Sequence, residues 1–374
     1  MTREWDYTLA MLWLAAVTVG FVMVASASYP LGTSHGAPAS FVIRHGAYLF
    51  AGCVALGICV FVPLRMWQTI HRPLLIGALA LAALVLLPGI GHSSHGSRRW
   101  LALGPFSLQA AEVAKFALVV YLAGYLARNQ AALATDWVAL VRPLALVGLL
   151  CGMLLLEPDF GSVVVLVAVT GGVLFLAGAR LRHFLLIVLV AVLLLAILSV
   201  LQPYRLQRMV TFLDPWADAT GSGYQLTQAL IAFGRGDLFG LGLGAGIQKL
   251  LYLPEAHNDF IFAVVAEELG IVGALLVFGL LIALVLRIFR VAGDALSDGR
   301  PFAGYVAYGT ALLLGIQCVI NVGVNTGTLP TKGLTLPFIS YGGNSLIVCC
   351  ALIGLVLRVH LERGVQGERM RPRR

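Results

Sequence analysis

Charged residues are scarce in this 374-residue sequence, where Asp, Glu, Lys and Arg together make up 11% of the chain. A soluble domain carries about 25% charged residues, and no soluble fold could bury the 60% of hydrophobic residues found here. The sequence also lacks the alternating segments of about ten residues that form a membrane β-barrel. These absences predict an all-α integral membrane protein, whose helices are apolar runs of about 17 to 25 residues.

Cysteine pairs suited to disulfides or zinc are missing as well. All six cysteines lie in apolar runs and none forms a CxxC pair, so we expect neither a disulfide framework nor a zinc site. The net charge of +8 does not indicate nucleic-acid binding, because Lys and Arg sit in short clusters between apolar runs, as topology determinants do. His92 and His95 have no carboxylate or cysteine at ligand spacing, which argues against a metal site there.

About ten apolar runs are expected to span the membrane. They lie near residues 9–28, 46–63, 74–90, 108–127, 138–156, 162–178, 184–201, 260–286, 303–324 and 344–361. Residues 25–27 resemble a signal-peptide cleavage site, but the run before them is long for a signal peptide and Glu4 and Asp6 precede it, so we expect a retained span. Most of the 25 Lys and Arg fall on the N-terminal side of the membrane, which predicts cytoplasmic N- and C-termini.

One long polar-leaning stretch, residues 202–268, interrupts this pattern. Loops of that length are usually functional or disordered, and its recurring aromatic residues favour a folded structure. We therefore expect a single membrane domain over residues 1–374, with a large extracytoplasmic cap at 202–259 between spans seven and eight and a basic cytoplasmic tail at 362–374. The glycine-rich run within the cap lacks the βαβ context of a dinucleotide site, so its glycines are expected to permit close approach or sharp turns.

Glu112 and Lys115 are two charges in a predicted span. Ionisable residues at membrane depth are costly and usually pair or face a cavity, and a spacing of three puts both on one helix face. They fit a structural ion pair, a polar cleft in which Lys115 turns towards an anion, or both. Arg98 and Arg99 lie in the outer loop before that span, and paired guanidinium groups suit phosphate oxygens.

The expected cap side carries further cations. Such a ring fits an anionic headgroup such as a lipid-linked diphosphate, and attraction to the bilayer's own phosphates is the alternative. Its members are Arg205, Arg208, Lys249 and Lys332. Between spans five and six, residues 157–161 are expected to form a tight turn with Asp159 as a helix cap.

Asp259 is the strongest candidate for a catalytic residue. It follows a polar stretch, precedes an apolar run and occupies an expected N-cap position for the eighth span. A single carboxylate near a cationic pocket suits a general base. A glycosidase-like pair of Glu255 and Asp259 is a less favoured alternative.

Several stretches together resemble the SEDS family (shape, elongation, division and sporulation), in its division branch rather than its elongation branch. The resemblance covers nearly the whole chain, from about Tyr7 to the tenth span. The stretches are 97–101, 111–115, 158–161, 221–226, 253–262 and 329–343. The sequence departs from the family pattern at Ala110, Glu157 and Asn344, where the family usually has Pro, Gln and a small residue.

The resemblance implies a ten-span peptidoglycan glycosyltransferase of the inner membrane at the division septum, which polymerises lipid II. It implies Asp259 as the catalytic carboxylate and a class B penicillin-binding transpeptidase of the division machinery as partner. The other polar candidates are then expected to bind substrate, and a divalent cation, Mg²⁺ or Mn²⁺, could share the task. These are Arg98, Glu112, Lys115, Arg205, Arg208, Lys249, His257 and Lys332.

Two other functions remain open at this point. The bundle with its polar intramembrane pair also suits a flippase that moves lipid II across the membrane, although no clear internal repeat of the kind common in transporters is present. A non-catalytic scaffold that recruits a division transpeptidase is the third hypothesis. Transport of labelled lipid II, or division supported by a catalytically inactive variant, would distinguish them.

Overall fold

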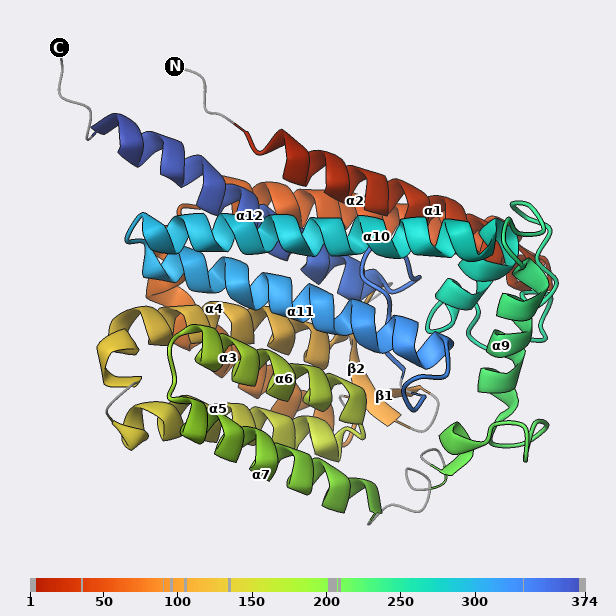
Figure 1. Ribbon diagram of the computed structural model, residues 1–374, viewed down its shortest axis with the longest axis horizontal. Coiled ribbons are helices and arrows are strands. Elements are labelled where there is room, and N and C mark those ends of the chain that lie inside the picture. The colour runs from red at the N-terminus through yellow and green to blue at the C-terminus, as the bar shows by residue number, and fades with distance from the viewer. Residues whose placement is uncertain are drawn as a thin grey trace.

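Apolar helices make up most of the molecule (Figure 1). The computed structural model describes residues 5–34, 36–89, 91–94, 97–103, 106–133, 136–200, 207, 210–331 and 333–369. The helices are α1 (Tyr7–Ser34), α2 (Ser40–Phe61), α3 (Leu64–Leu86), α4 (Ala110–Leu133), α5 (Trp137–Leu156), α6 (Phe160–Leu176), α7 (Leu181–Val200), α9 (Tyr224–Gly236), α10 (Ile261–Ser297), α11 (Pro301–Asn325) and α12 (Gly343–Arg369).

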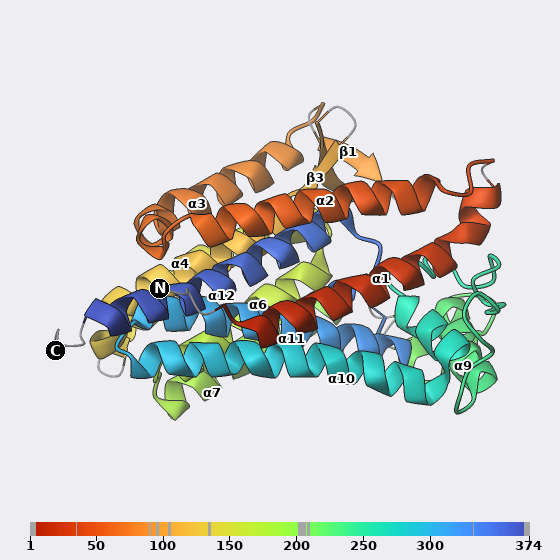
Figure 2. The same ribbon diagram turned by 90° about the horizontal axis from the view of Figure 1, so that it is seen from above.

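The helices agree with the apolar runs of the sequence. In the described part of the chain, nine helices are long and apolar enough to cross a membrane, and α6 is a shorter apolar helix. The all-α membrane fold is thus confirmed. The start of α1 and the end of α12 lie towards one end of the bundle, whereas α9 lies across the other end (Figures 1 and 2). This arrangement fits the prediction that the termini and the cap lie on opposite sides of the membrane.

Helix α4 is the most buried of the candidate spans. Within the most apolar 18-residue stretch of α4, 83% of the residues are buried, whereas none are buried in the corresponding stretch of α7. Helix α4 packs against α3 and α11 in particular, whereas α7 contacts α6 and lies at the edge of the bundle (Figure 1). Charged residues on α4 are therefore enclosed by protein.

A small antiparallel sheet precedes α4, in a segment expected to be a loop. Strands β1 (Gly91–Ser94), β2 (Ser97–Leu103) and β3 (Phe106–Gln109) pair in the order β1-β2-β3. Strands of four to seven residues give little periodic signal in the sequence. The sheet holds the Arg98–Arg99 pair and leads directly into α4.

Helix α10 is broken at Gly270, whose φ of 73° and ψ of −179° are not helical. Residues 237–249, which we call the glycine loop, fill this break, so the backbone groups that the break releases find partners. The bonds run from Leu241 N to Glu267 O (3.0 Å), Gly242 N to Glu268 O (3.0 Å), Ile271 N to Asp237 O (2.9 Å) and Val272 N to Leu238 O (3.2 Å).

The glycines of this loop are required by close packing. A Cβ on Gly240 would lie 2.2 Å from the Glu268 carbonyl oxygen, and the φ of Gly240 is +80°. A Cβ on Gly246 would meet the Glu267 and Glu268 carboxylates at about 3 Å. Close backbone approach and sharp turning, the roles expected for this glycine-rich run, are both confirmed.

Two polar contacts join α1 to α10. At one end Arg287 donates to the Asp6 carboxylate at 2.9 Å. At the other, Ser26 Oγ donates to Glu268 at 2.7 Å, and Lys249 of the glycine loop pairs with the same carboxylate at 2.5 Å. We call these contacts the terminal latch and the cap latch. No Asp, Glu, Lys or Arg lies between them on either helix.

Candidate functional site

Three consecutive backbone carbonyls hold the segment that contains Asp259. The His257 carbonyl accepts from the Tyr341 N–H at 2.9 Å, and the Asn258 carbonyl accepts from the Ser340 hydroxyl at 2.7 Å. The Asp259 carbonyl accepts from the side-chain amides of Asn321 and Asn325, each at 2.9 Å. Residues from α11 and from the 329–343 loop thus fix the backbone on which the carboxylate stands.

Asp259 is not the helix cap that the sequence suggested. The N-cap of α10 is Phe260, with no side-chain capping bond. The Ala263 N–H instead donates to Asn325 Oδ1 at 3.1 Å, so a side chain from α11 satisfies the helix start. Asp259 is half-buried, and a Cβ placed on Gly333 would lie 3.0 Å from its Oδ2. Its carboxylate therefore faces the 329–343 loop, where glycine leaves room for it.

His257 lies in an aromatic cluster. Its ring centroid is 5.3 Å from that of Phe41 on α2 and 5.5 Å from that of Tyr341. Burial lowers the pKa of His257, and the nearby Glu255 carboxylate acts in the opposite direction. The imidazole packs against Phe41 of α2 and helps to hold the segment that carries Asp259.

The expected ion pair of α4 is formed. Lys115 Nζ lies 2.7 Å from Glu112 Oε1, and both side chains are buried. The charges neutralise each other within one helix face, as the spacing predicted. A role for either residue towards substrate stays a prediction.

Of the two neighbouring arginines in β2, the structure describes the side chain of Arg99 but only the backbone of Arg98. Arg99 donates to two backbone carbonyls of the α5–α6 turn, those of Glu157 at 3.1 Å and Pro158 at 2.5 Å. This guanidinium fastens the sheet to the turn. The Arg98 backbone belongs to β2, and its side chain lies outside the described part of the structure, as do Arg205, Arg208 and Lys332.

The α5–α6 turn closes one side of the same region. Asp159 caps α6 by accepting from Ser162 N at 3.2 Å and Ser162 Oγ at 2.9 Å, which confirms the expected cap. A Cβ on Gly161 would be 3.3 Å from the Leu334 side chain and 3.8 Å from the Gly333 carbonyl oxygen. The turn therefore abuts the same glycine that faces Asp259.

Glu157 is the buried acid of this turn. Its side chain is fully buried, and neither carboxyl oxygen has a hydrogen-bond partner among the described residues. Burial raises the pKa of Glu157 to about 8, with a further increase from Asp159 and an opposing effect of Arg99. The group is thus mainly a neutral acid near pH 7, close in shape and charge to the Gln usual in the family.

Lys249 has a structural partner. Its side chain is buried, and its ammonium contacts both the Glu268 carboxylate and the Ser26 hydroxyl, 2.7 Å away. The Glu268 carboxylate also accepts from Gly244 N at 3.0 Å. This geometry favours fixing the glycine loop to the bundle, whereas the expected contact of Lys249 with substrate stays a prediction.

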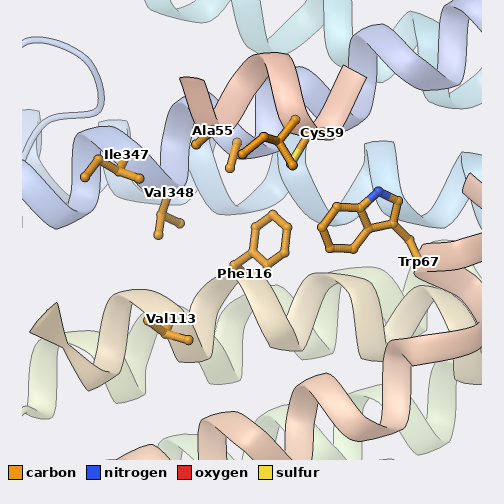
Figure 3. A pocket seen from close by; sticks show the side chains of 9 residues that line it. Ala55, Cys59, Trp67, Val113, Phe116, Ile347 and Val348 are labelled. Carbon is orange, nitrogen blue, oxygen red and sulfur yellow. The ribbon is translucent and has the colours of Figure 1, made fainter. Parts of the chain in front are cut away.

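An apolar pocket of about 240 Å³ lies between α2, α3, α4 and α12 (Figure 3). Trp67, Phe116 and Cys59 are among its lining residues, and no charged side chain contributes. Its chemistry fits hydrocarbon. The described residues contain no group of three or more His, Cys, Asp or Glu side chains that could hold a metal ion.

Sequence reasoning missed the two amides that hold Asp259. Asn321 and Asn325 are four residues apart in an apolar helix, so they share one face, and both are buried. Polar side chains in a membrane helix need partners because lipid offers none. Their spacing therefore indicates, from the sequence alone, that both bind a polar partner on one side of the helix. It does not indicate which segment supplies that partner.

The chain matches a known protein family over most of its length. The model of the cell cycle protein family of FtsW, RodA and SpoVE matches residues 6–364. The chain belongs to this family. The resemblance of the sequence to this family is thereby confirmed over nearly the whole chain.

Named relatives cover almost the same length. The chain is 49% identical over 355 residues to the probable peptidoglycan glycosyltransferase FtsW of Legionella pneumophila, covering 95% of this chain and 90% of that protein. It is 50% identical over 352 residues to the protein of the same name from Nitrosococcus halophilus, covering 93% and 90%.

Solved structures share the fold. A chain from a study of how a peptidoglycan synthase complex coordinates polymerization and crosslinking is 33% identical, with a TM-score of 0.79, covering 96% of this chain and 98% of that chain. The rod shape determining protein RodA of Thermus thermophilus is 31% identical, with a TM-score of 0.71 and the same coverage.

Proposed function

We propose that this protein is a peptidoglycan glycosyltransferase that polymerises lipid II into glycan strands during cell division. The observation that carries the proposal is the fixed Asp259 segment in a chain of the FtsW family. Bonds to three consecutive carbonyls hold its backbone, and its carboxylate faces a glycine. Preorganisation of this kind suits a general base, which must meet the proton it removes within hydrogen-bonding distance.

In the proposed reaction Asp259 accepts the proton of the sugar 4-hydroxyl of the acceptor lipid II. The resulting oxygen nucleophile forms a bond to the anomeric carbon of the donor chain. The bond between that carbon and the diphosphate oxygen breaks, and undecaprenyl diphosphate leaves with the electron pair. Charge grows on the diphosphate, so cations fixed in a site of low dielectric would lower the barrier.

We assign this electrostatic role to Arg98, Arg208, Lys115 and Lys332, with Arg205 as a further headgroup contact. Among these four side chains, that of Lys115 is the one the structure describes. Its ammonium is buried away from water and paired with the Glu112 carboxylate. The apolar pocket of α2, α3, α4 and α12 offers hydrocarbon-compatible space on the bundle. Polar headgroup chemistry and apolar chain binding would then use separate surfaces.

The decisive test is synthesis of glycan from fluorescent lipid II by the purified full chain with its cognate class B transpeptidase. Moenomycin would silence contaminating classical glycosyltransferases. Asp259→Asn is expected to abolish glycan ladders, and Asp218→Asn, a matched change of an exposed acid bonded to Ser222, is expected to retain them. Ladders of equal strength from Asp259→Asn would remove Asp259 from the chemistry.

The flippase alternative draws on the broken helix α10, because discontinuous helices mark the binding sites of many transporters. In this structure the glycine loop satisfies the backbone groups around the break, which favours a rigid junction over a transport site. Flipping of labelled lipid II by purified protein in vesicles, abolished by Glu112→Ala, would support transport instead. Absence of both activities would favour the scaffold.

A further inference from the structure

Residues 238–252, which comprise most of the glycine loop and the residues that follow it, expose no charged side chain, and the exposed Asp237 directly precedes them. From Leu238 to Tyr252 the only charged residue is Lys249, and that side chain is buried against Glu268. Large apolar side chains are exposed instead, with Phe239 at 80% and Leu243 at 57%. Water-exposed loops rarely show such a surface, and contiguous apolar patches mark interaction sites.

The position of the loop along the bundle follows from the two latches between α1 and α10. About twenty residues separate the latches along each helix, which corresponds to roughly 30 Å at 1.5 Å per residue. This is the hydrocarbon thickness of a typical bilayer, and neither helix carries a charge between its latches. The cap latch, formed by Ser26, Glu268 and Lys249, therefore marks one edge of the hydrocarbon layer.

The first residues of the glycine loop lie on the bilayer side of this edge, whereas Leu241 and Gly242, which donate to the Glu267 and Glu268 carbonyls, lie level with it. Val272 N and Ile271 N, which follow Glu268 towards the middle of the bundle, donate to the Leu238 and Asp237 carbonyls. Ile271, Val272, Leu275 and Leu276 on the same helix expose their side chains. The loop thus continues the lipid-facing surface of α10, and both ribbon views place it where α1 and α10 meet (Figures 1 and 2).

We propose that residues 238–243 insert into the membrane leaflet on the cap side, with phospholipid acyl chains as the occupant. Leu238, Phe239, Leu241 and Leu243 supply the apolar contacts. The buried pairing of Lys249 leaves Asp237, at the start of the loop, as the exposed charge next to them. The loop anchors the cap to the bilayer at the level of the helix break. This inference is independent of the proposed reaction.

The test uses the full chain in nanodiscs of phosphatidylethanolamine and phosphatidylglycerol that contain a phospholipid with a diazirine in its acyl chain. After illumination, mass spectrometry locates the adducts. Adducts are expected in 238–243 and at the internal reference Leu275–Leu276. None is expected at Trp216, an exposed cap residue that lies between the exposed acids Asp214 and Asp218.

A matched pair of variants sharpens this result. Phe239→Asp is expected to reduce labelling of 238–243 several-fold while the α10 reference is unchanged, and Trp216→Asp is expected to change neither. Labelling of the α10 reference without labelling of the wild-type loop would overturn the proposal. So would loss of loop labelling on addition of the transpeptidase, because the face would then belong to a protein partner.

Discussion

Two regions of the bundle hold their buried polar side chains in different ways. Around α1, α10 and α11 these bonds join segments far apart in the chain, as in Ser26 to Glu268 and Asn325 to Asp259. In α4 to α6 many stay within three or four residues, as in Lys115 to Glu112, Asp159 to Ser162 and Asn129 to Tyr125.

The difference follows from what each region must fix. Helices α4, α5 and α6 are continuous apolar helices that pack along their length, so their polar groups need only local partners. The other region contains irregular backbone at 237–260, 329–331 and 333–342, which has no repeating hydrogen-bond pattern to fix it. Long-range polar bonds replace that pattern, and the Asp259 segment depends on them.

The largest expected loss of stability comes from breaking one of the two buried lysine–glutamate pairs, that of Lys249 and Glu268. Lys249→Met leaves the Glu268 carboxylate buried without its cation and is expected to lower the free energy of unfolding by about 3–5 kcal/mol. Adding Glu268→Gln should restore most of the loss but leave a deficit, because the glycine loop loses an attachment to α10. The measurement is chemical unfolding in detergent micelles.

The matched double change Glu112→Gln with Lys115→Met is expected to be nearly neutral for stability, because that pair joins residues of one helix. A double-mutant cycle for each pair would isolate the pairwise energies. A deficit in the α4 double variant as large as in the Lys249–Glu268 double variant would remove the distinction between local and long-range pairs.

Glu157 and Glu268 are both fully buried acids, and their different surroundings predict an effect of pH. Glu268 has three partners, whereas Glu157 has no hydrogen-bond partner among the described residues and a pKa raised to about 8 by burial. A raised folded-state pKa stabilises the fold below the unfolded value near 4.5, and this contribution is lost as the pH rises through 8.

Glu157→Gln is therefore expected to be more stable than the wild type at pH 8.5, by on the order of 4 kcal/mol, and similar to it at pH 5. Thermal unfolding across this pH range would show the two curves converging towards low pH. Parallel curves at all pH values would mean that Glu157 does not titrate with unfolding.

Alanine variants of two asparagines allow the stability contribution of a long-range side-chain amide bond to be compared with that of a local one. Asn325→Ala leaves the Asp259 carbonyl with one fewer donor and the Ala263 N–H with only the Phe260 carbonyl as acceptor, so a loss of about 1–3 kcal/mol is expected. Polymerisation should also fall, because the segment of the proposed base loosens. Asn129→Ala removes a bond to the backbone of Tyr125 and should stay within about 0.5 kcal/mol. Equal losses would contradict the comparison.

The apolar helices were predictable because each is encoded by a continuous run. Their ends were not, since α10 continues through Arg287 to Ser297, where polar residues extend the helix beyond the hydrocarbon layer. In the candidate site the cap at Asp159 was predictable because it stands in a local motif, and the catalytic role of Asp259 stays a prediction. Lys249 and Asn325 depend on partners 19 and 62 residues away, and no local pattern encodes such distances.

The smallest expected effect tests the local region by itself. Asp159→Ala removes the α6 cap, which accepts from Ser162 N and Oγ, and should cost about 1 kcal/mol of unfolding free energy, as helix caps usually do. Asp159→Asn retains an acceptor oxygen and should recover most of that loss. If Asp159→Ala instead cost as much as Lys249→Met, the turn would be fixing distant segments, and Gly161 beside Gly333 would be the contact through which it does so.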